Sequence, residues 1–429
     1  MLAQLISLQD RVRSSLFVVP MLCVAGGVVL GELMLVADAR VDRLPSGLTA
    51  TVDSARAVLS VVASATLAFA GIAFSVSLLL ISLSSSQYSP RIVHGLFRDP
   101  FNTRVMGIVV GTFTYCLVVL RAVRGPLEQS GERVVPNLAV LVALALGVVS
   151  VLAIIAFIDH AAHSMDVSKI LRRATNESIV QVRGRWPAPG VTTYELDSSP
   201  PSGSGHVIRF EREGWVQHVD HEALLGVLDV DATLLLDTTA GRFAIPHVPF
   251  ARAWPLPGGR EEFDRRVRAA VIVGETRTMQ QDARFGVRQL VDVALKALSP
   301  GINDPTTAQD AMFHLGAVLA EMLARPPLPR ALHGCDGRRL LLPQESTHEE
   351  LIDLAFDEMR IAAAGQPTVS IYLLELLDLL GSSLDSRNQS VEAALRRQAK
   401  LTLAVSERAD LPQADLERVR YAYRDRFDR

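Results

Sequence analysis

Long apolar runs alternate with short charged segments from the N-terminus to about residue 160. A helix needs roughly 20 apolar residues to cross the hydrocarbon core of a bilayer. Four runs reach or approach this length, which predicts a four-helix transmembrane domain over residues 1–165. The expected spans are Leu16–Val36, Ala57–Leu83, Val105–Leu120 and Leu138–Ile158.

The first run has one feature of a cleaved signal peptide, since Ala37-Asp38-Ala39 offers a small-x-small cleavage site. Its apolar stretch is longer than the usual signal-peptide core and three further spans follow, which favours a retained membrane anchor. Arginine and lysine residues near the span ends give a small excess on the side of the N-terminus. This bias favours a topology with both termini in the cytoplasm.

Small and hydroxyl residues recur along one face of the second span, at steps of three, four and seven residues. One interpretation is close helix packing, because small residues let two backbones approach and hydroxyls bond across the contact. The other is that this face lines a water-filled path through the membrane. The residues of this serine stripe are Ser60, Ser64, Ala68, Gly71, Ser75 and Ser82.

Glycine and alanine pairs with a spacing of four also occur in the other three spans. Such pairs predict tight helix contacts, within one subunit or between subunits. The pairs are Gly27 with Gly31, Gly107 with Gly111, and Ala143 with Gly147.

Polar residues near the span ends are candidates for function. Glu32 is the only acid inside a predicted span, which makes ion handling a hypothesis, although it is close enough to the end to reach the headgroups. His160 and His163 share a helical face and could sense pH, but no third ligand is fixed by spacing, so no metal site is predicted. Tyr88 and Arg91 suit an interfacial anchor or the mouth of a pore.

From Asp166 onward the charges are spread evenly, which predicts a water-exposed α+β domain. Short runs with strand character predict a β-rich subdomain over residues 166–258. They are Ser178–Val182, His206–Phe210, Thr233–Asp237 and Arg242–Ile245. Amphipathic patterns predict a helical subdomain over residues 259–429. Its helices are expected near residues 285–298, from 305 onward, and at 349–364, 369–384, 391–406 and 412–427.

A dense polar segment surrounds a predicted helix-turn-helix in this helical part. Asp304 followed by Pro305 fits an N-cap and a first helical position, so capped turns with solvated flanks explain much of the pattern. The alternative is a polar functional site. Its candidate residues are Arg277, Asp282, Asn303, Asp304 and Thr307.

Composition narrows the classes of function. The net charge of −3 gives no indication of nucleic-acid binding, and the three cysteines form neither a disulfide framework nor a zinc motif. The chain contains no glycine-rich phosphate loop and no nucleophile elbow, so no catalytic residue and no cofactor is predicted.

Three sequence strings, SSSQYSPR, ETRTMQQDARFG and ALSPGINDPTTA, occur in this order after the second span. With the membrane spans they resemble a bacterial family of membrane proteins called domain of unknown function 2254, over most of the chain to about residue 380. The resemblance implies a bacterial membrane protein. It brings no catalytic residues.

These features favour a homo-oligomeric ion channel or transporter of the bacterial inner membrane, with a cytoplasmic domain that gates or assembles it. Its expected partners are the lipid bilayer, further copies of the chain and small ions. Four spans are too few for one subunit to form a typical carrier, so a homo-oligomer would be required. The alternatives are a membrane-anchored sensor or scaffold without transport activity and, less favoured, a membrane enzyme.

Overall fold

The computed structural model describes residues 18–40, 50–87, 100–124, 135–164, 166–189, 199–334, 336–343, 347–384 and 389–428. The chain divides into two compact units, Met1–Asp166 and Val167–Arg429.

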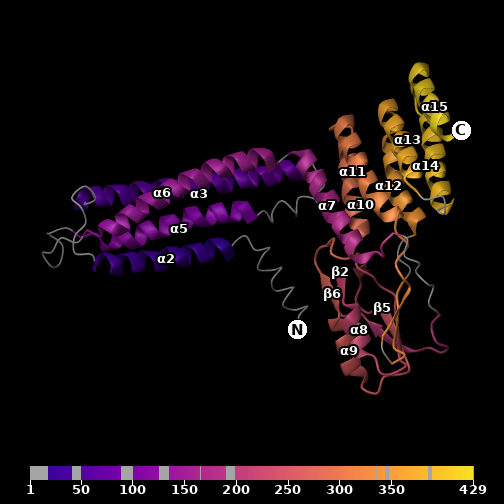
Figure 1. Ribbon diagram of the computed structural model, residues 1–429, viewed down its shortest axis with the longest axis horizontal. Coiled ribbons are helices and arrows are strands. Elements are labelled where there is room, and N and C mark those ends of the chain that lie inside the picture. The colour runs from indigo at the N-terminus through magenta and orange to yellow at the C-terminus, as the bar shows by residue number, and fades with distance from the viewer. Residues whose placement is uncertain are drawn as a thin grey trace. The chain divides into compact units, whose positions relative to one another are not determined.

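In the described part of the first unit, four long apolar helices lie side by side (Figure 1). They are α2 (Val18–Asp38), α3 (Val52–Gln87), α5 (Pro100–Ala122) and α6 (Asn137–Ser164). Each contains a stretch long and apolar enough to cross a membrane. The predicted fold class, four membrane helices followed by a region of mixed sheets and helices, is confirmed.

Glycine allows the closest helix contacts of this unit. A Cβ atom built on Gly27 of α2 would lie 2.5 Å from the carbonyl oxygen of Gly111 on α5. On α6, a Cβ atom built on Gly147 would lie 3.2 Å from a methyl group of Val62 on α3. These glycines therefore make contacts within one chain, as expected for small residues between membrane helices.

Polar contacts join the same helices. The carboxylate of Asp38, at the end of α2, accepts hydrogen bonds from the backbone N–H groups of Leu138 (3.0 Å) and Ala139 (2.8 Å) in the first turn of α6. An acid suits this position because the N-terminal N–H groups of a helix lack intrahelical partners. Further into the bundle, Ser150 of α6 donates to the hydroxyl of Thr112 on α5 at 3.0 Å, and both residues are buried.

Two sheets form the β part of the second unit. The five-stranded sheet has the order β1-β5-β3-β8-β7, and the three-stranded sheet the order β4-β2-β6. All pairs are antiparallel except β3 with β8, which are parallel. The strands are β1 (His206–Arg209), β2 (Gly214–Val219), β3 (Thr233–Leu236), β4 (Phe243–Ala244), β5 (Pro249–Trp254), β6 (Val271–Gly274), β7 (Ala331–His333) and β8 (Arg339–Leu341).

Two short helices, α8 (His221–Val227) and α9 (Arg260–Ala269), belong to the β part and share one apolar core with the sheets. Strands β6, β7 and β8 and helix α9 all follow residue 258, so the sheets extend past the expected boundary between the β-rich and helical subdomains. The predicted boundary at residue 258 marks the point where the sequence pattern changes from strand-like to helical. Such a boundary misses strands that come later in the chain and still join the sheet. Here β7 and β8 return after α10 and α11.

The expected strand Ser178–Val182 is wrong, because these residues lie in helix α7 (Val167–Arg185). Residues at intervals of three and four, from Ile170 and Ala174 to Ser178 and Val182, are buried on one face. Five neighbouring residues read in isolation resemble a strand, but the spacing of the buried residues over the longer segment is helical.

Helices complete the second unit, and Figure 1 shows them gathered at one side of the sheets. They are α7, α10 (Ala283–Ala297), α11 (Pro305–Leu323), α12 (His348–Ala362), α13 (Pro367–Ser382), α14 (Gln389–Arg408) and α15 (Gln413–Phe427). α10 and α11 both pack against α7, while α13 packs against α11, α14 and α15.

Candidate functional site

The serine stripe lies on the face of α3 that points away from the other membrane helices. Ser60, Ser64, Ala68, Gly71, Ser75 and Ser82 are all exposed among the described residues. The face of α3 that packs within the chain carries buried Ala55, Leu59, Ala63 and Ala73. At 100° per residue these two faces are centred about 150° apart. The stripe therefore makes no helix contact inside the described part of this chain.

One serine hydroxyl on this face has a hydrogen-bond acceptor in its own helix. Ser75 donates to the carbonyl oxygen of Gly71 at 2.9 Å. This bond satisfies the hydroxyl inside an apolar environment. A Cβ atom built on Gly71 would meet no atom within 4 Å, so space is open beside the helix at this point.

Glu32 forms an ion pair across α2 and α5. Its carboxylate accepts a hydrogen bond from the guanidinium of Arg121 at 2.6 Å, and both side chains are at least half exposed. Arg121 is in the last turn of α5. The acid therefore has a cationic partner at the end of the membrane segment, which explains its presence without a passing ion.

The two histidines at the end of α6 point to different partners. The His160 ring packs on the Phe101 ring of α5, with centroids 4.6 Å apart. His163 Nδ1 lies 2.8 Å from the backbone carbonyl oxygen of Asp159. Among the described residues no group of three or more His, Cys, Asp or Glu side chains could hold a metal ion. Tyr88 and Arg91 lie outside the described residues.

The five residues of the expected polar site occupy the two opposite ends of α10. Asp282 is the N-cap of α10, and its carboxylate accepts a hydrogen bond from the backbone N–H of Phe285 at 3.1 Å. Asp304 follows the C-terminal end of α10 and caps α11 instead. With 15 residues in α10 and about 1.5 Å of rise per residue, the two acids are separated by the length of a helix. They do not form one site.

At the first end of α10, Arg277 and Asp282 form a locked pair. Arg277 Nε donates to Asp282 Oδ2 at 2.5 Å, and the carboxylate is 3% exposed. The guanidinium carbon also lies over the rings of Trp215 (5.7 Å) and Phe285 (5.0 Å). A Cβ atom on Gly241, whose φ is +86°, would collide with the carboxylate. Cation–π contacts and the ion pair thus hold the loop before α10 against the β part.

At the second end of α10, a capped turn uses the other three residues. Asp304 accepts from the backbone N–H of Thr307 at 3.1 Å and from its hydroxyl at 2.6 Å. These hydrogen bonds lower the pKa of Asp304 below its usual value. Asn303 adopts a left-handed conformation with φ of 48°, and its side-chain oxygen accepts from Gln366 at 2.9 Å. The SPGINDP sequence is therefore accounted for by turn and cap geometry.

A histidine pair that sequence reasoning missed lies at the junction of α7 with the β part. His218 of β2 and His221 of α8 are close enough to Arg185, at the end of α7, to be affected by its positive charge. Gln281 completes the cluster. Its side-chain amide accepts a hydrogen bond from the backbone N–H of Val219 and donates one to the carbonyl oxygen of Val219. Its backbone carbonyl oxygen accepts a hydrogen bond from the guanidinium of Arg185. The spacing of the histidines was visible in the sequence, but the approach of Arg185 depends on the fold.

Burial lowers the pKa of His221 to about 4, and the positive charge of Arg185 acts in the same direction. The pKa of His218 is lowered too, first by burial. Both imidazoles are therefore neutral in the folded protein at neutral pH, where they can accept and donate one hydrogen bond each.

We expect the folded water-exposed unit to lose stability as the pH falls from about 6.5 to about 4. In this window the unfolded chain takes up a proton on His221 and the folded protein does not, so protonation favours unfolding. Replacing His221 by Gln should flatten the dependence of the unfolding midpoint on pH, measured by thermal denaturation of the full chain. His333→Gln, at an exposed histidine, is the control, and an unchanged slope in H221Q would contradict the prediction.

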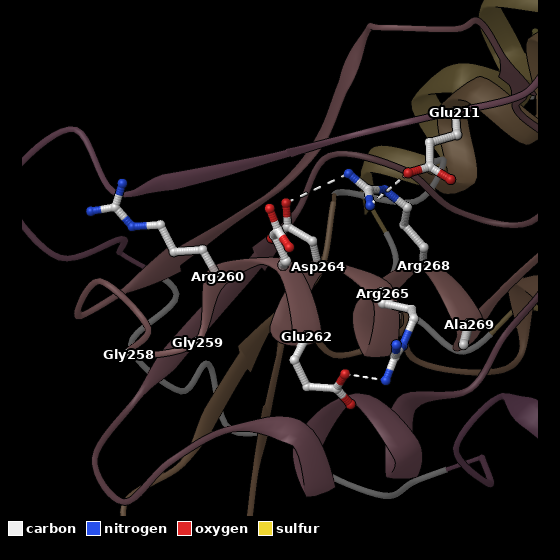
Figure 2. Close-up of a pocket in the computed structure, with 10 residues that line it drawn as sticks. Glu211, Gly258, Gly259, Arg260, Glu262, Asp264, Arg265, Arg268 and Ala269 are labelled. Carbon is white, nitrogen blue, oxygen red and sulfur yellow. Dashed lines mark hydrogen bonds and ion pairs between the residues drawn. The ribbon is translucent and has the colours of Figure 1, made fainter.

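Figure 2 shows a wide polar depression beside α9. Five of its charged residues form ion pairs with one another: Arg268 contacts Glu211 at 2.8 Å and Asp264 at 3.5 Å, and Arg265 pairs with Glu262. Asp264 also lies 2.6 Å from His206 Nε2. Ion pairs of this kind account for the composition of the depression, and no group in it is arranged as a nucleophile with a base.

The geometry defines an integral membrane protein with four α-helical spans and a C-terminal region of mixed sheets and helices. The model of the predicted membrane protein family DUF2254 matches residues 13–378, and the chain belongs to this family.

Two uncharacterized mycobacterial proteins are similar to it, one from Mycobacterium tuberculosis (strain ATCC 25618 / H37Rv) and one from Mycobacterium bovis. Each is 29% identical over 418 residues, which cover 95% of this chain and 79% of the relative. No solved structure matches the chain significantly. The family description names a membrane protein and no activity.

Proposed function

We propose that the protein is a homo-oligomeric ion channel or transporter in which the serine stripe of α3 lines the path between subunits. The observation that carries the proposal is the exposure of the whole stripe on the face of α3 opposite its packed face. The small residues of α2, α5 and α6 pack against other helices of the same chain, whereas the small residues of the stripe do not.

Two properties of the stripe favour a polar path over simple contact with lipid. Its side chains are small, so they leave room beside the helix, and four of the six carry hydroxyls that could bind water or an ion; the hydroxyl of Ser75 would exchange its bond to the Gly71 carbonyl oxygen. Polar groups within membrane spans face a bundle interior or a water-filled cavity much more often than they face lipid. One chain cannot enclose such a cavity with this face, so several copies are required.

The setting follows from the class of protein. A bacterial chain with four spans would reside in the inner membrane, and the small excess of basic residues favours a topology with both termini and the Val167–Arg429 unit in the cytoplasm. In that position the water-exposed unit would assemble or gate the channel.

Ion flux into liposomes containing the purified full-length protein tests the proposal. Wild-type protein should conduct, and Ser75→Leu should reduce flux about tenfold or more, because a branched apolar side chain would narrow and dewet the path. Ala65→Leu is the matched control, since Ala65 is exposed on α3 outside the stripe. Absence of flux for every ion tried, over a range of pH and voltage, would refute the channel.

A membrane-anchored sensor or scaffold is the second candidate. The locked loop before α10 favours it, since the loop ties the helices of the water-exposed unit to its sheets through Arg277 and Asp282. An oligomer in which the stripe packs against a neighbouring helix, with no solvated path, would support this candidate.

A further inference from the structure

An exposed basic face lies on α7, the helix that follows the last membrane span. One side of α7 carries its buried residues, and the helix packs against α10 and α11. At 100° per residue the exposed charged residues of α7 lie on the other side, and bases outnumber acids there by four to one. These residues are Lys169, Arg172, Arg173, Arg183 and Glu177.

Two of the positive charges on this face lack a counterion in the protein. Arg173 and Arg183 each contact a glutamate carboxylate at 2.8 Å. Lys169 and Arg172 form no ion pair with any residue that the structure describes. Both side chains are exposed, so their charges can meet an anion from outside the chain.

The connection between α6 and α7 keeps these two cations close to the end of the last span. The span ends at His163, and the backbone N–H of Asp166 donates to the His163 carbonyl oxygen at 3.4 Å, so the connection turns instead of extending. Lys169 and Arg172 follow Asp166 by three and six residues. Peptide and helix geometry place their Cα atoms no more than about 10 Å and about 13 Å from that of Asp166.

The end of α6 reaches the level of the lipid headgroups. The span Asn137–His163 has 27 residues. As a helix it is about 40 Å long, which matches a bilayer with its headgroup layers rather than the hydrocarbon core alone. Lys169 and Arg172 have long flexible side chains, so their charged groups can reach back toward this layer from the start of α7.

Charge decides which partner fits this face. Basic residues next to a span are attracted to anionic lipids over about a Debye length, roughly 8 Å at physiological ionic strength. Val180 is the one large apolar side chain of α7 that is strongly exposed, at 64%. The face therefore offers little apolar area to a protein partner, and its free charges complement a phosphate group.

We propose that Lys169 and Arg172 bind the phosphate groups of anionic phospholipids at the membrane surface where α6 ends. This contact goes beyond the channel proposal and does not depend on it, since a protein that conducts no ions would bind lipid in the same way. The start of the water-exposed unit would then respond to the anionic lipid content of the membrane.

Photolabelling of the full-length protein in liposomes tests the proposal. One probe is a phosphatidylglycerol with a diazirine on its headgroup, at low mole fraction in phosphatidylcholine vesicles. The other is a phosphatidylcholine with the diazirine at the same depth. Mass spectrometry should find residues 166–176 labelled about fivefold more, or better, by the anionic probe. Lys169→Gln combined with Arg172→Gln should remove most of this preference, and high salt should weaken it in the wild type.

Lys400→Gln combined with Arg408→Gln is the matched control, because it removes the same two charges from exposed residues of α14. This variant should label like the wild type. Lys169→Arg combined with Arg172→Lys keeps both charges and should keep the preference, which separates charge from any effect on folding. Equal labelling by the two probes, or the same loss in both Gln variants, would overturn the proposal. Crosslinks from a photoreactive residue at position 172 to a second copy of the chain instead of to lipid would also overturn it.

Discussion

Replacing Gly27 by Val should destabilise the membrane unit by about 3 kcal/mol, the upper part of the range for overpacking a tight contact. A Cβ atom at this position would lie 2.5 Å from the carbonyl oxygen of Gly111, and a backbone atom cannot rotate away as a side chain can. α2 and α5 would have to separate, which would also weaken the other contacts along their interface.

Gly26→Val provides the comparison for this prediction. A Cβ atom on Gly26 meets nothing within 4 Å, while both substitutions change helix propensity in the same way. Unfolding of each purified variant in detergent, followed by circular dichroism over a titration with a denaturing detergent, gives the two losses of stability. Equal losses would show that α2 and α5 do not meet at Gly27.

Replacing Asp282 by Ala should destabilise the water-exposed unit by about 3 kcal/mol. The substitution removes the cap of α10 and leaves the half-buried guanidinium of Arg277 without its anion, between two aromatic rings. Asp282→Asn should recover only the stability that comes from capping α10, because an Asn side chain can cap the helix but carries no negative charge for Arg277. Chemical denaturation of the full chain, followed by tryptophan fluorescence, reports on this region because Trp215 lies beside Arg277.

Asp304→Ala is the matched control, because Asp304 also caps a helix, α11, through hydrogen bonds from Thr307. Its loss should cost about 1 kcal/mol, the usual value of an N-cap. A cost for Asp282→Ala no larger than that of Asp304→Ala would mean that the pair with Arg277 adds nothing to stability.

The membrane half could be predicted from the sequence because its signal is long and local. A run of apolar residues that fills a span is visible without knowing what it packs against. The helical boundaries agree less well: α3 begins at Val52 and extends to Gln87, past both predicted ends. Its first residues, including Ala55, are buried against the bundle, a contact that hydropathy cannot reveal.

The candidate site was less predictable, because the same residue types serve as caps and as functional groups. Asp282 and Asp304 were both found by their polar context, and both turned out to cap helices. Their separation by α10 depends on where that helix begins and ends. The cluster around His221 was missed for the opposite reason, since Arg185 approaches it from a distant part of the chain.

Asp38 has a consequence for the order in which the membrane unit matures. This acid ends the first helix, and the N–H groups that it caps belong to the fourth. The carboxylate and its two partners are 100 and 101 residues apart in the sequence, so α3 and α5 are synthesised before the bonds can form. At this end the first span therefore gains its hydrogen bonds to α6 only after the last span has been made, and a chain that stops short of α6 keeps the contacts of α2 with α5 but lacks these bonds.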